Sequence, residues 1–246
     1  MSYREFLPHP QLRSYIDAYW TVRIDGQEYH PPVTDRILPD GCVDIILNLG
    51  TAVPVVSSHI ILQSDAVYLV GAMTRFSLTR LHAGAWLLGI RFKPGCFNAF
   101  YHFSLQSLTD RVQLFDPAFK VDHDAFSGSD FVQTLDHCLM QRISGVEHTL
   151  LPVIADIYDL KGQVSVDRIA KKHFIENRRL ERSFKQHTGL TPKAFANLVR
   201  FRFALQRIKQ RHESSLLEIA FDMGYYDHAH LANEIRKYTG LTPSQC

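Results

Sequence analysis

The chain of 246 residues lacks the features that mark membrane and secreted proteins. No uninterrupted apolar run reaches the roughly 18 residues that a membrane-spanning helix needs, and the opening stretch MSYREFLPHP lacks the charged and then apolar arrangement of a signal peptide. The four cysteines are scattered, without the C-x-x-C spacing of zinc ribbons or the density of a disulfide framework. We therefore expect a cytoplasmic protein with reduced thiols and no membrane contact.

The chain also has little net charge, formally +2, but the charge is distributed unevenly between its two parts. Residues 155–246 hold 16 Lys and Arg against 10 Asp and Glu, a net charge of +6; this leaves 11 against 15, a net charge of −4, for residues 1–154. A basic half is typical of a surface that meets a polyanion, although a solvated surface whose sign simply varies gives the same count.

The two halves differ in hydrophobic periodicity. Up to about residue 92, short β-favouring runs such as VDIILNL and AWLLGIRF are separated by Gly, Pro, Asp and Ser, which predicts an antiparallel sheet or barrel. Beyond that point the period becomes helical, and residues 130–143 form a predicted helix with the apolar stripe Phe131, Leu135, Cys138 and Leu139. We predict an α+β chain: a β-rich, barrel- or sandwich-like domain with trailing helices over residues 1–146, and an all-helical domain over residues 147–246.

The helical half contains an internal repeat. Residues 168–192, RIAKKHFIENRRLERSFKQHTGLTP, align with residues 218–243, EIAFDMGYYDHAHLANEIRKYTGLTP, once one extra residue is allowed in the second copy. Similarity of this length indicates that one supersecondary unit occurs twice. Each copy ends in G-L-T-P, in which Gly suits the left-handed position that closes a helix, Thr is a good N-cap and Pro favours the first helical position.

Each copy predicts two short helices joined by a tight turn, over about residues 165–186 and 215–238. Ser165 and Asp227 are candidate N-caps, and Gly224 supplies the turn of the second copy. One helix over about residues 192–210 connects the copies and spans about 27 Å. A helical hairpin with a purely structural role would explain one such pattern. Two copies joined by one helix instead favour a pair of helix-turn-helix units, whose second helices face a DNA duplex.

Residues from about 150 to 246 resemble the DNA-binding domain of the AraC/XylS family of bacterial transcription regulators. The second copy matches the family pattern I-A-x-x-x-G-F-x-D-x-S-H-F-x-R-x-F-K-x-x-x-G-x-x-P at Ile219, Ala220, Gly224, Asp227, His230, Gly240 and Pro243. Asn233 departs from it, because the pattern has a DNA-facing Arg there. The resemblance implies a sequence-specific regulator, an activator and not an enzyme, whose partners are double-stranded DNA and RNA polymerase.

The stretches HPQLRSYIDAYW, LPDGCVDIILNLG and GIRFKPGCFNAF look like the amino-terminal domain on one branch of these regulators. In this family that position holds a small-molecule sensing or dimerisation module. The resemblance therefore implies an effector pocket in the β-rich part, for which we expect the lining residues Trp20, Phe76, Trp86 and Arg91. It also implies a homodimer; the apolar stripe of the helix over residues 130–143 is then either a dimer seam or core of its own domain.

The candidate DNA-binding residues occupy the predicted outward face of the second helix in each copy. In the first copy they are Asn177, Arg178, Arg179, Glu181, Arg182 and Lys185. In the second copy they are His228, Ala229, Asn233, Arg236 and Lys237. The first set carries more positive charge, so we expect it to dominate affinity, with Arg178 and Arg182 at base edges and Lys185 on phosphate.

Three alternatives concern the amino-terminal part. A metal site is conceivable at Asp40, Cys42 and Asp44 with His82 or His102, but no H-x-H or E-x-x-H spacing occurs there, so we expect neither metal nor cofactor. Cys42 could act as a methyl-accepting thiol, as in some proteins with this DNA-binding unit, but its acidic neighbours disfavour the thiolate. The third alternative is a barrel-type enzyme acting on small molecules, with a helical tail for protein association.

Overall fold

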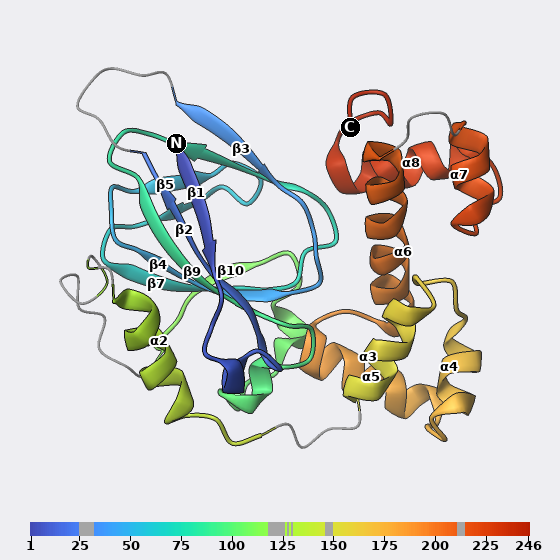
Figure 1. Cartoon of the computed structure of the whole chain (residues 1–246), viewed down its shortest axis with the longest axis horizontal. Helices are drawn as coiled ribbons and strands as arrows, with labels where there is room; N and C mark the ends of the chain where they lie inside the picture. Colours follow the sequence, from blue (N-terminus) through green and yellow to red (C-terminus); the bar gives the residue numbers. More distant parts are fainter. Residues whose placement is uncertain (25–31, 118–125, 127, 129, 146–149, 211–214) are drawn as a thin grey trace.

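The computed structural model describes residues 1–24, 32–117, 126, 128, 130–145, 150–210 and 215–246. Two sheets form the amino-terminal part, and helices form the carboxyl-terminal part (Figure 1). The predicted α+β class is therefore confirmed. The predicted boundary between residues 146 and 147 lies outside the described residues.

Antiparallel strands build both sheets. The larger has the order β1-β2-β9-β4-β7-β10, formed by Ser2–Phe6, Ile16–Arg23, Trp86–Phe92, Val43–Asn48, Ala66–Val70 and Val112–Leu114. The smaller has the order β3-β8-β5-β6, formed by Val33–Ile37, Ser77–Leu81, Val53–Val55 and Ile60–Leu62. Short 3-10 turns, η1 (Pro10–Leu12), η2 (Phe97–Ala99) and η3 (Leu105–Ser107), lie between strands or follow them.

The inner strands of the larger sheet are buried on both faces. Successive side chains of a strand point to opposite faces, so along β4 the side chains of Ile45 and Leu47 enter one core while Ile46 enters the other. Tyr19 and Trp20 are divided in the same way on β2. Burial on both faces explains why β4 is a nearly continuous apolar run rather than an alternating one.

Helix α2 (Phe131–Met140) covers the face of the larger sheet that is turned away from the smaller sheet. Its stripe residues Phe131, Leu135 and Leu139 are buried in that core. The carboxylate Oδ1 of Asp136 accepts hydrogen bonds from the backbone N–H of His9 at 2.9 Å and from the Tyr19 hydroxyl at 2.8 Å. Of the two readings of the stripe, the structure therefore supports core of its own domain, and the homodimer itself stays a prediction.

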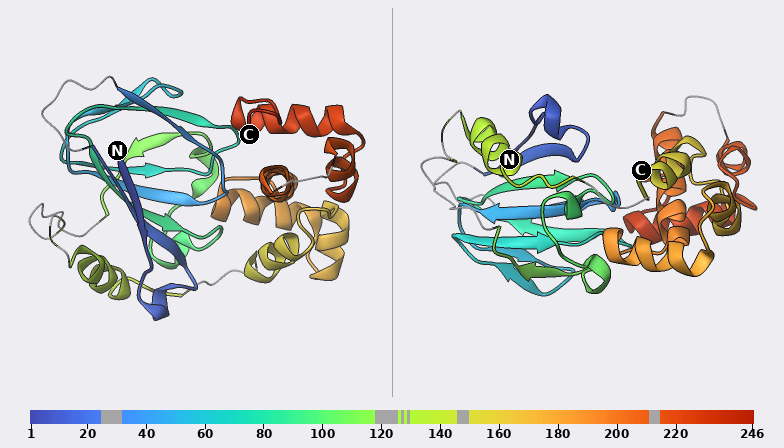
Figure 2. Two further views of the ribbon diagram at one scale, coloured as in Figure 1. Left: turned by 45° about the horizontal axis from the view of Figure 1, so that its top comes forward. Right: turned by 90° about the horizontal axis from the view of Figure 1, so that it is seen from below.

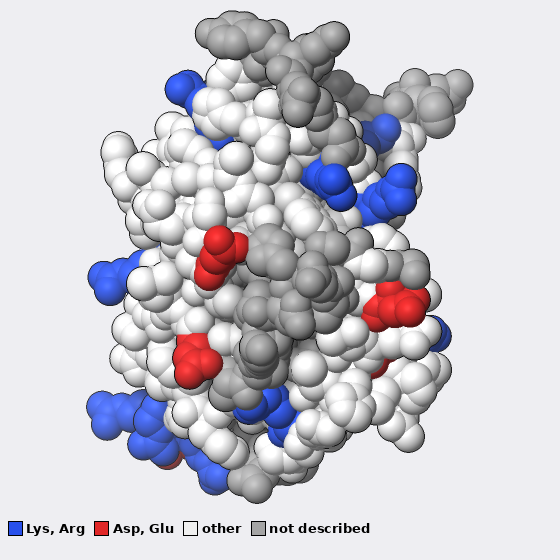
Figure 3. All heavy atoms as spheres, turned by 90° about the vertical axis from the view of Figure 1, so that its left-hand side faces the viewer, with Lys and Arg blue, Asp and Glu red and all other residues white. Residues whose placement is uncertain are grey.

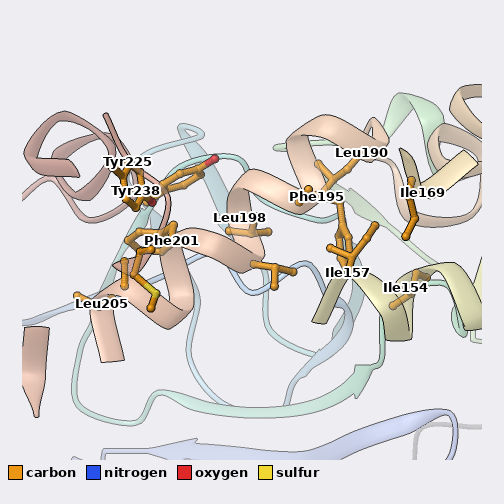
Figure 4. Close-up of a cluster of buried hydrophobic side chains, with 14 of the residues drawn as sticks. Ile154, Ile157, Ile169, Leu190, Phe195, Leu198, Phe201, Leu205, Tyr225 and Tyr238 are labelled. Atoms are coloured by element: carbon orange, nitrogen blue, oxygen red, sulfur yellow. The ribbon is translucent and has the colours of Figure 1, made fainter. Parts of the chain in front are cut away.

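The carboxyl-terminal helices share one core. They are α3 (Leu150–Asp159), α4 (Val166–Lys172), α5 (Asn177–Thr188), α6 (Pro192–Lys209), α7 (Leu216–Asp222) and α8 (His228–Thr239). Helix α6 is the axis of this core, because its side chains Phe195, Leu198, Phe201 and Leu205 are buried among those of the other helices (Figure 4). The α4–α5 and α7–α8 pairs lie toward opposite ends of α6 (Figure 1).

The helical part lies beside one end of the two sheets (Figure 2). Two hydrogen bonds join the parts near the Thr-Gly pair that ends the second helix of each copy: the Thr109 hydroxyl donates to the carbonyl of Gly189 after α5, and the guanidinium of Arg36 donates to the carbonyl of Thr239 at the end of α8. Nδ1 of His187 also lies 3.2 Å from Oδ1 of Asn98. The amino-terminal domain thus contacts both helix pairs close to the carboxyl-terminal end of their second helix.

Candidate nucleic-acid interface

The two helix pairs have the same turn. The backbone N–H of Ile175 donates to the carbonyl of Ala170 at 3.0 Å, and that of Tyr225 donates to the carbonyl of Ala220 at 2.8 Å. The preceding residue is left-handed in both copies, with φ of +54° at Phe174 and +69° at Gly224. The repeat in sequence is therefore a repeat in backbone geometry.

Local capping explains where these helices begin. The Ser165 hydroxyl accepts from the backbone N–H of Arg168 at 3.2 Å, and the Asp227 carboxylate accepts from that of His230 at 2.7 Å. Ser215 and Glu218 exchange side-chain and backbone hydrogen bonds as a capping box at the start of α7. Each contact satisfies a backbone donor that a helix start leaves unpaired.

The T-G-L-T-P stretches end helices α5 and α8 with the same set of hydrogen bonds. The Thr188 hydroxyl donates to the carbonyl of Phe184 at 2.8 Å and accepts from the N–H of Leu190 at 3.1 Å. Thr239 bonds the carbonyl of Ile235 and the N–H of Leu241 in the same way, at 2.7 and 3.0 Å. Both threonines are buried, and the glycine that follows each is left-handed.

The copies differ in what comes next. Thr191 caps the N–H of Ala194 at 3.1 Å, and Pro192 begins helix α6. In the second copy the N–H of Gln245 donates to the carbonyl of Thr242 at 2.9 Å, which closes a turn. The same sequence signal thus starts an 18-residue helix in one copy and a single turn in the other.

Helix α6 holds the second helix pair through Arg200. Its Nη1 donates to the carbonyl of Gly224 at 3.3 Å, and its guanidinium lies 4.4 Å from the centre of the Tyr225 ring. Further along α6, the ring of Phe201 stacks on Tyr238 with a centroid separation of 4.5 Å. These contacts fix the turn of the second pair to the connecting helix, which favours a rigid spacing between the two recognition helices.

The first candidate set lies on the exposed side of α5. Asn177, Arg178, Arg179, Glu181 and Arg182 are exposed, and Lys185 is half-buried. The inward positions of the same helix, Leu180 and Phe184, are buried. Asn177 donates a hydrogen bond to Asp167 of α4, so it also helps to hold the first helix pair together.

The second candidate set is less basic. His228, Ala229, Asn233, Arg236 and Lys237 of α8 are all exposed. The Nζ atom of Lys237 lies 3.6 Å from a carboxylate oxygen of Glu234 and 4.6 Å from the centre of the Tyr238 ring, so part of its charge is engaged within the helix. The structure places both candidate sets on the second helix of their pair, where their role in binding DNA stays a prediction.

A partly exposed cluster of ion pairs, which the sequence does not predict, joins α3 to α4. Oδ2 of Asp156 lies 2.7 Å from Nζ of Lys172 and 2.6 Å from Nε2 of His173. Hydrogen bonds from Lys172 and His173 lower the pKa of Asp156. Since Lys172 is engaged here, it is a weaker candidate for phosphate contact than the cations of α5.

Figure 3 shows the face of the molecule that the amino-terminal domain turns away from the helices. On the described part of this face, basic and acidic side chains are scattered and do not form a continuous basic surface. The excess of positive charge belongs to residues 155–246. A polyanion is therefore expected on the helices.

A cavity of about 970 Å³ lies between the two sheets and α6. Trp20, Phe76 and Arg91 line it, as predicted for an effector pocket. Trp86 does not, because the strand alternation of β9 directs its side chain to the opposite face, where it packs against the other core beside Arg23. The structure therefore brings three of the four predicted residues together and excludes Trp86.

Cys42 also lines the cavity and is buried, with 8% of its surface exposed. Burial raises the pKa of its thiol well above the ordinary value, and Asp40 and Asp44 raise it further. This environment opposes the thiolate that a methyl-accepting cysteine needs. Within the described residues no group of three or more His, Cys, Asp and Glu has the arrangement of a metal site, and no helix is both long and apolar enough to cross a bilayer.

Comparison with known proteins adds two domain matches. Residues 4–113 match a family described as a domain of unknown function (DUF6597), and residues 169–246 match one described as a helix-turn-helix domain. An uncharacterized HTH-type transcriptional regulator of Haemophilus influenzae is 27% identical over 154 residues, covering 58% of this chain and 51% of that protein. The HTH-type transcriptional activator RhaS of Pectobacterium carotovorum is 28% identical over 144 residues, covering 57% and 50%.

The chain spans about half the length of these curated relatives. Among solved structures, ToxT of Vibrio cholerae with a bound unsaturated fatty acid has a TM-score of 0.48 and 11% identity, covering 92% of this chain and 94% of that one.

The duplicated turns and the match over residues 169–246 define the carboxyl-terminal part as a DNA-binding domain with two helix-turn-helix units. This match confirms the resemblance of the carboxyl-terminal part to the DNA-binding domain of the AraC/XylS family.

Proposed function

We propose that the chain is a sequence-specific DNA-binding transcription regulator whose activity is controlled by a small molecule bound in the amino-terminal domain. The observation that carries this proposal is the pair of helix-turn-helix units with equal turns at the two ends of one 18-residue helix. About 27 Å of helix is comparable to the ~34 Å between successive major-groove faces of DNA. One molecule can therefore offer two recognition helices to one side of a duplex.

The first unit is expected to supply most of the affinity. Arg178 and Arg182 are exposed on α5, and their side chains make no hydrogen bond or ion pair with other described residues, so their guanidinium groups are available for base edges. Lys185, one turn beyond Glu181, is our candidate for a phosphate contact. Homodimerisation, contact with RNA polymerase, activation of transcription and a cytoplasmic location belong to the same proposal and rest on the family resemblance.

The test begins with fragmented genomic DNA: fragments retained by the purified full chain are sequenced to define the operator. Operator affinity of Arg182→Ala is then measured by fluorescence anisotropy. If Arg182 contacts guanine with two hydrogen bonds, the loss is ~1–3 kcal/mol, or about 5- to 150-fold. Arg4→Ala is the matched control, because Arg4 is an exposed arginine on β1, outside the helical part.

Lys185→Ala separates phosphate contact from base readout. Loss of one phosphate contact should weaken binding similarly on operator and unrelated DNA, and should reduce the slope of log affinity against log salt by about 1. Operator affinity that is unchanged in Arg182→Ala would remove the assignment of α5 as the dominant reader. Binding without sequence preference or salt dependence would contradict the proposed function itself.

A further inference from the structure

The cavity between the sheets has an apolar body. Its walls include Val22, Ile46, Leu62, Leu81 and Leu87 from the two sheets, and Phe201 and Leu205 from α6. A volume of about 970 Å³ is at the upper end of the range that encloses a drug-sized ligand, and such sites are mostly apolar with a few placed polar groups. A molecule bound here touches both domains.

At one end of this cavity the guanidinium of Arg91 lies among carboxylates. Nη1 of Arg91 lies 3.1 Å from Glu5, while its Nε lies 3.5 Å from Asp40 and 3.6 Å from Asp44. One guanidinium thus faces three carboxylates. The Nε atom is buried and makes no hydrogen bond, so Arg91 does not pair fully with either aspartate.

Packing fixes Asp44 at this end. Gly89 on β9 lets the Trp20 ring lie directly over the strand, since a Cβ there would be 1.9 Å from Cε2 of Trp20. The indole Nε1 then donates to Oδ1 of Asp44 at 2.7 Å. Among the described residues no hydrogen bond reaches Oδ2 of Asp44, and this residue lines the cavity. Asp40, whose Oδ1 accepts from the backbone N–H of Cys42 at 2.9 Å, lines the same end.

Other cations that line the cavity are engaged or exposed. Arg36 donates to the carbonyl of Thr239 and lies over the Phe76 ring, and Arg202 donates to the backbone carbonyl of Asp40 at 3.3 Å. Arg75, Arg111 and Lys209 are exposed to solvent, where water and salt screen their charge. Asp40 and Asp44 are half-buried, so water and salt screen their charge less than that of these exposed side chains.

We propose that this cavity binds an amphipathic cation, whose ammonium or amidinium group lies between Asp44 and Asp40 beside the Trp20 ring and whose apolar body lies between the sheets and α6. A donor cation would supply the hydrogen bonds that the two aspartates lack. The indole face adds a cation–π contribution. The inference rests on the proposed function, because such a ligand is an effector only if the chain regulates transcription.

The test uses three probes with the same alkyl chain and different head groups: decylamine, 1-decanol and decanoate, each below its aggregation limit. Binding to the full chain without DNA is measured by isothermal titration calorimetry. We expect decylamine to bind at least tenfold more tightly than 1-decanol, and decanoate to bind most weakly. Decanoate or 1-decanol binding as tightly as decylamine would overturn the proposal.

Substitutions locate the head group. Asp44→Asn should weaken decylamine binding at least tenfold and leave 1-decanol binding unchanged, which also shows that the variant is folded. Asp40→Asn gives a second reading if Asp44→Asn does not fold. Asp159→Asn is the control, because Asp159 is exposed at the end of α3 and does not line the cavity. Unchanged decylamine affinity in the folded aspartate variants would also overturn the proposal.

The result is independent of the DNA assay. A chain that binds decylamine at Asp44 but has no operator keeps the cation site and loses the proposed function. A chain that binds an operator but prefers decanoate keeps the proposed function and loses the cation site.

Discussion

The turn of the second helix pair gives a stability prediction whose magnitude follows from geometry. Gly224 has φ of +69°, and its Cβ, if present, would lie 2.8 Å from Oε1 of Gln163. An L-residue in this conformation costs roughly 1–2 kcal/mol, of which about 0.4–1 kcal/mol is recovered because Ala restricts the unfolded chain. Gln163 must also move, which weakens or breaks the 3.0 Å hydrogen bond from its Nε2 to the carbonyl of Asp222. Such a hydrogen bond contributes about 0.5–1.5 kcal/mol to the free energy of unfolding.

Gly224→Ala should therefore lower the free energy of unfolding by about 1–3 kcal/mol, and Tm by roughly 2–4 °C for each kcal/mol in a chain of this size. The first repeat offers the opposite experiment. Phe174 occupies the equivalent position with φ of +54°, and 97% of its surface is exposed, so Phe174→Gly relieves strain without removing packing. After the entropy that Gly adds to the unfolded chain, we expect a gain of about 0.5–1 kcal/mol.

Thermal and urea unfolding of the full chain, followed by circular dichroism, measure both changes. Opposite signs for the two variants are the expected result, and Phe174→Ala, with its left-handed strain retained, should stay near the wild type. If Gly224→Ala melts at the wild-type temperature and binds operator normally, the left-handed turn does not constrain the second unit. Destabilisation by Phe174→Gly would show that the exposed ring has a structural contact outside the described residues.

Three further predictions concern packing, pH and assembly. Ala220 is fully buried where α7 meets α8, so Ala220→Leu should cost ~1–3 kcal/mol by overpacking in urea unfolding, and a neutral result would contradict close helix contact. Burial raises the pKa of Asp44 to about 7, against the attraction of Arg91 and with the help of Asp40 and Asp17. The folded chain therefore keeps the Asp44 proton up to about pH 7, whereas the unfolded chain releases it from about pH 4. The contribution of Asp44 to the free energy of unfolding should thus fall as the pH rises from about 4 to 7. Asp44→Asn should reduce this dependence on pH in urea unfolding, and an unchanged dependence would refute the assignment to Asp44. The full chain should sediment as a dimer at micromolar concentration, and a monomer would remove the dimer from the proposal.

The repeat, its caps and the change from strand to helix could be predicted from the sequence, because each depends on residues close together in the chain. Ser165, Asp227 and the T-G-L-T-P stretches act through hydrogen bonds over a few residues. The change of period from 2 to 3.6 separates the two domains for the same reason. Phe174 is the exception within the repeat, since nothing in its residue type indicates a left-handed turn.

Tertiary structure decided where those elements meet. Trp20 and Trp86 have similar strand contexts, yet sheet register directs one to the cavity and the other to the opposite core. The apolar stripe of α2 is compatible with a dimer seam until the sheet it covers is known. The ion cluster beside the cavity combines Asp44 of β4, Arg91 of β9 and Glu5 of β1, which the pairing of distant strands brings together. Such contacts depend on strand order and register, which local periodicity does not specify.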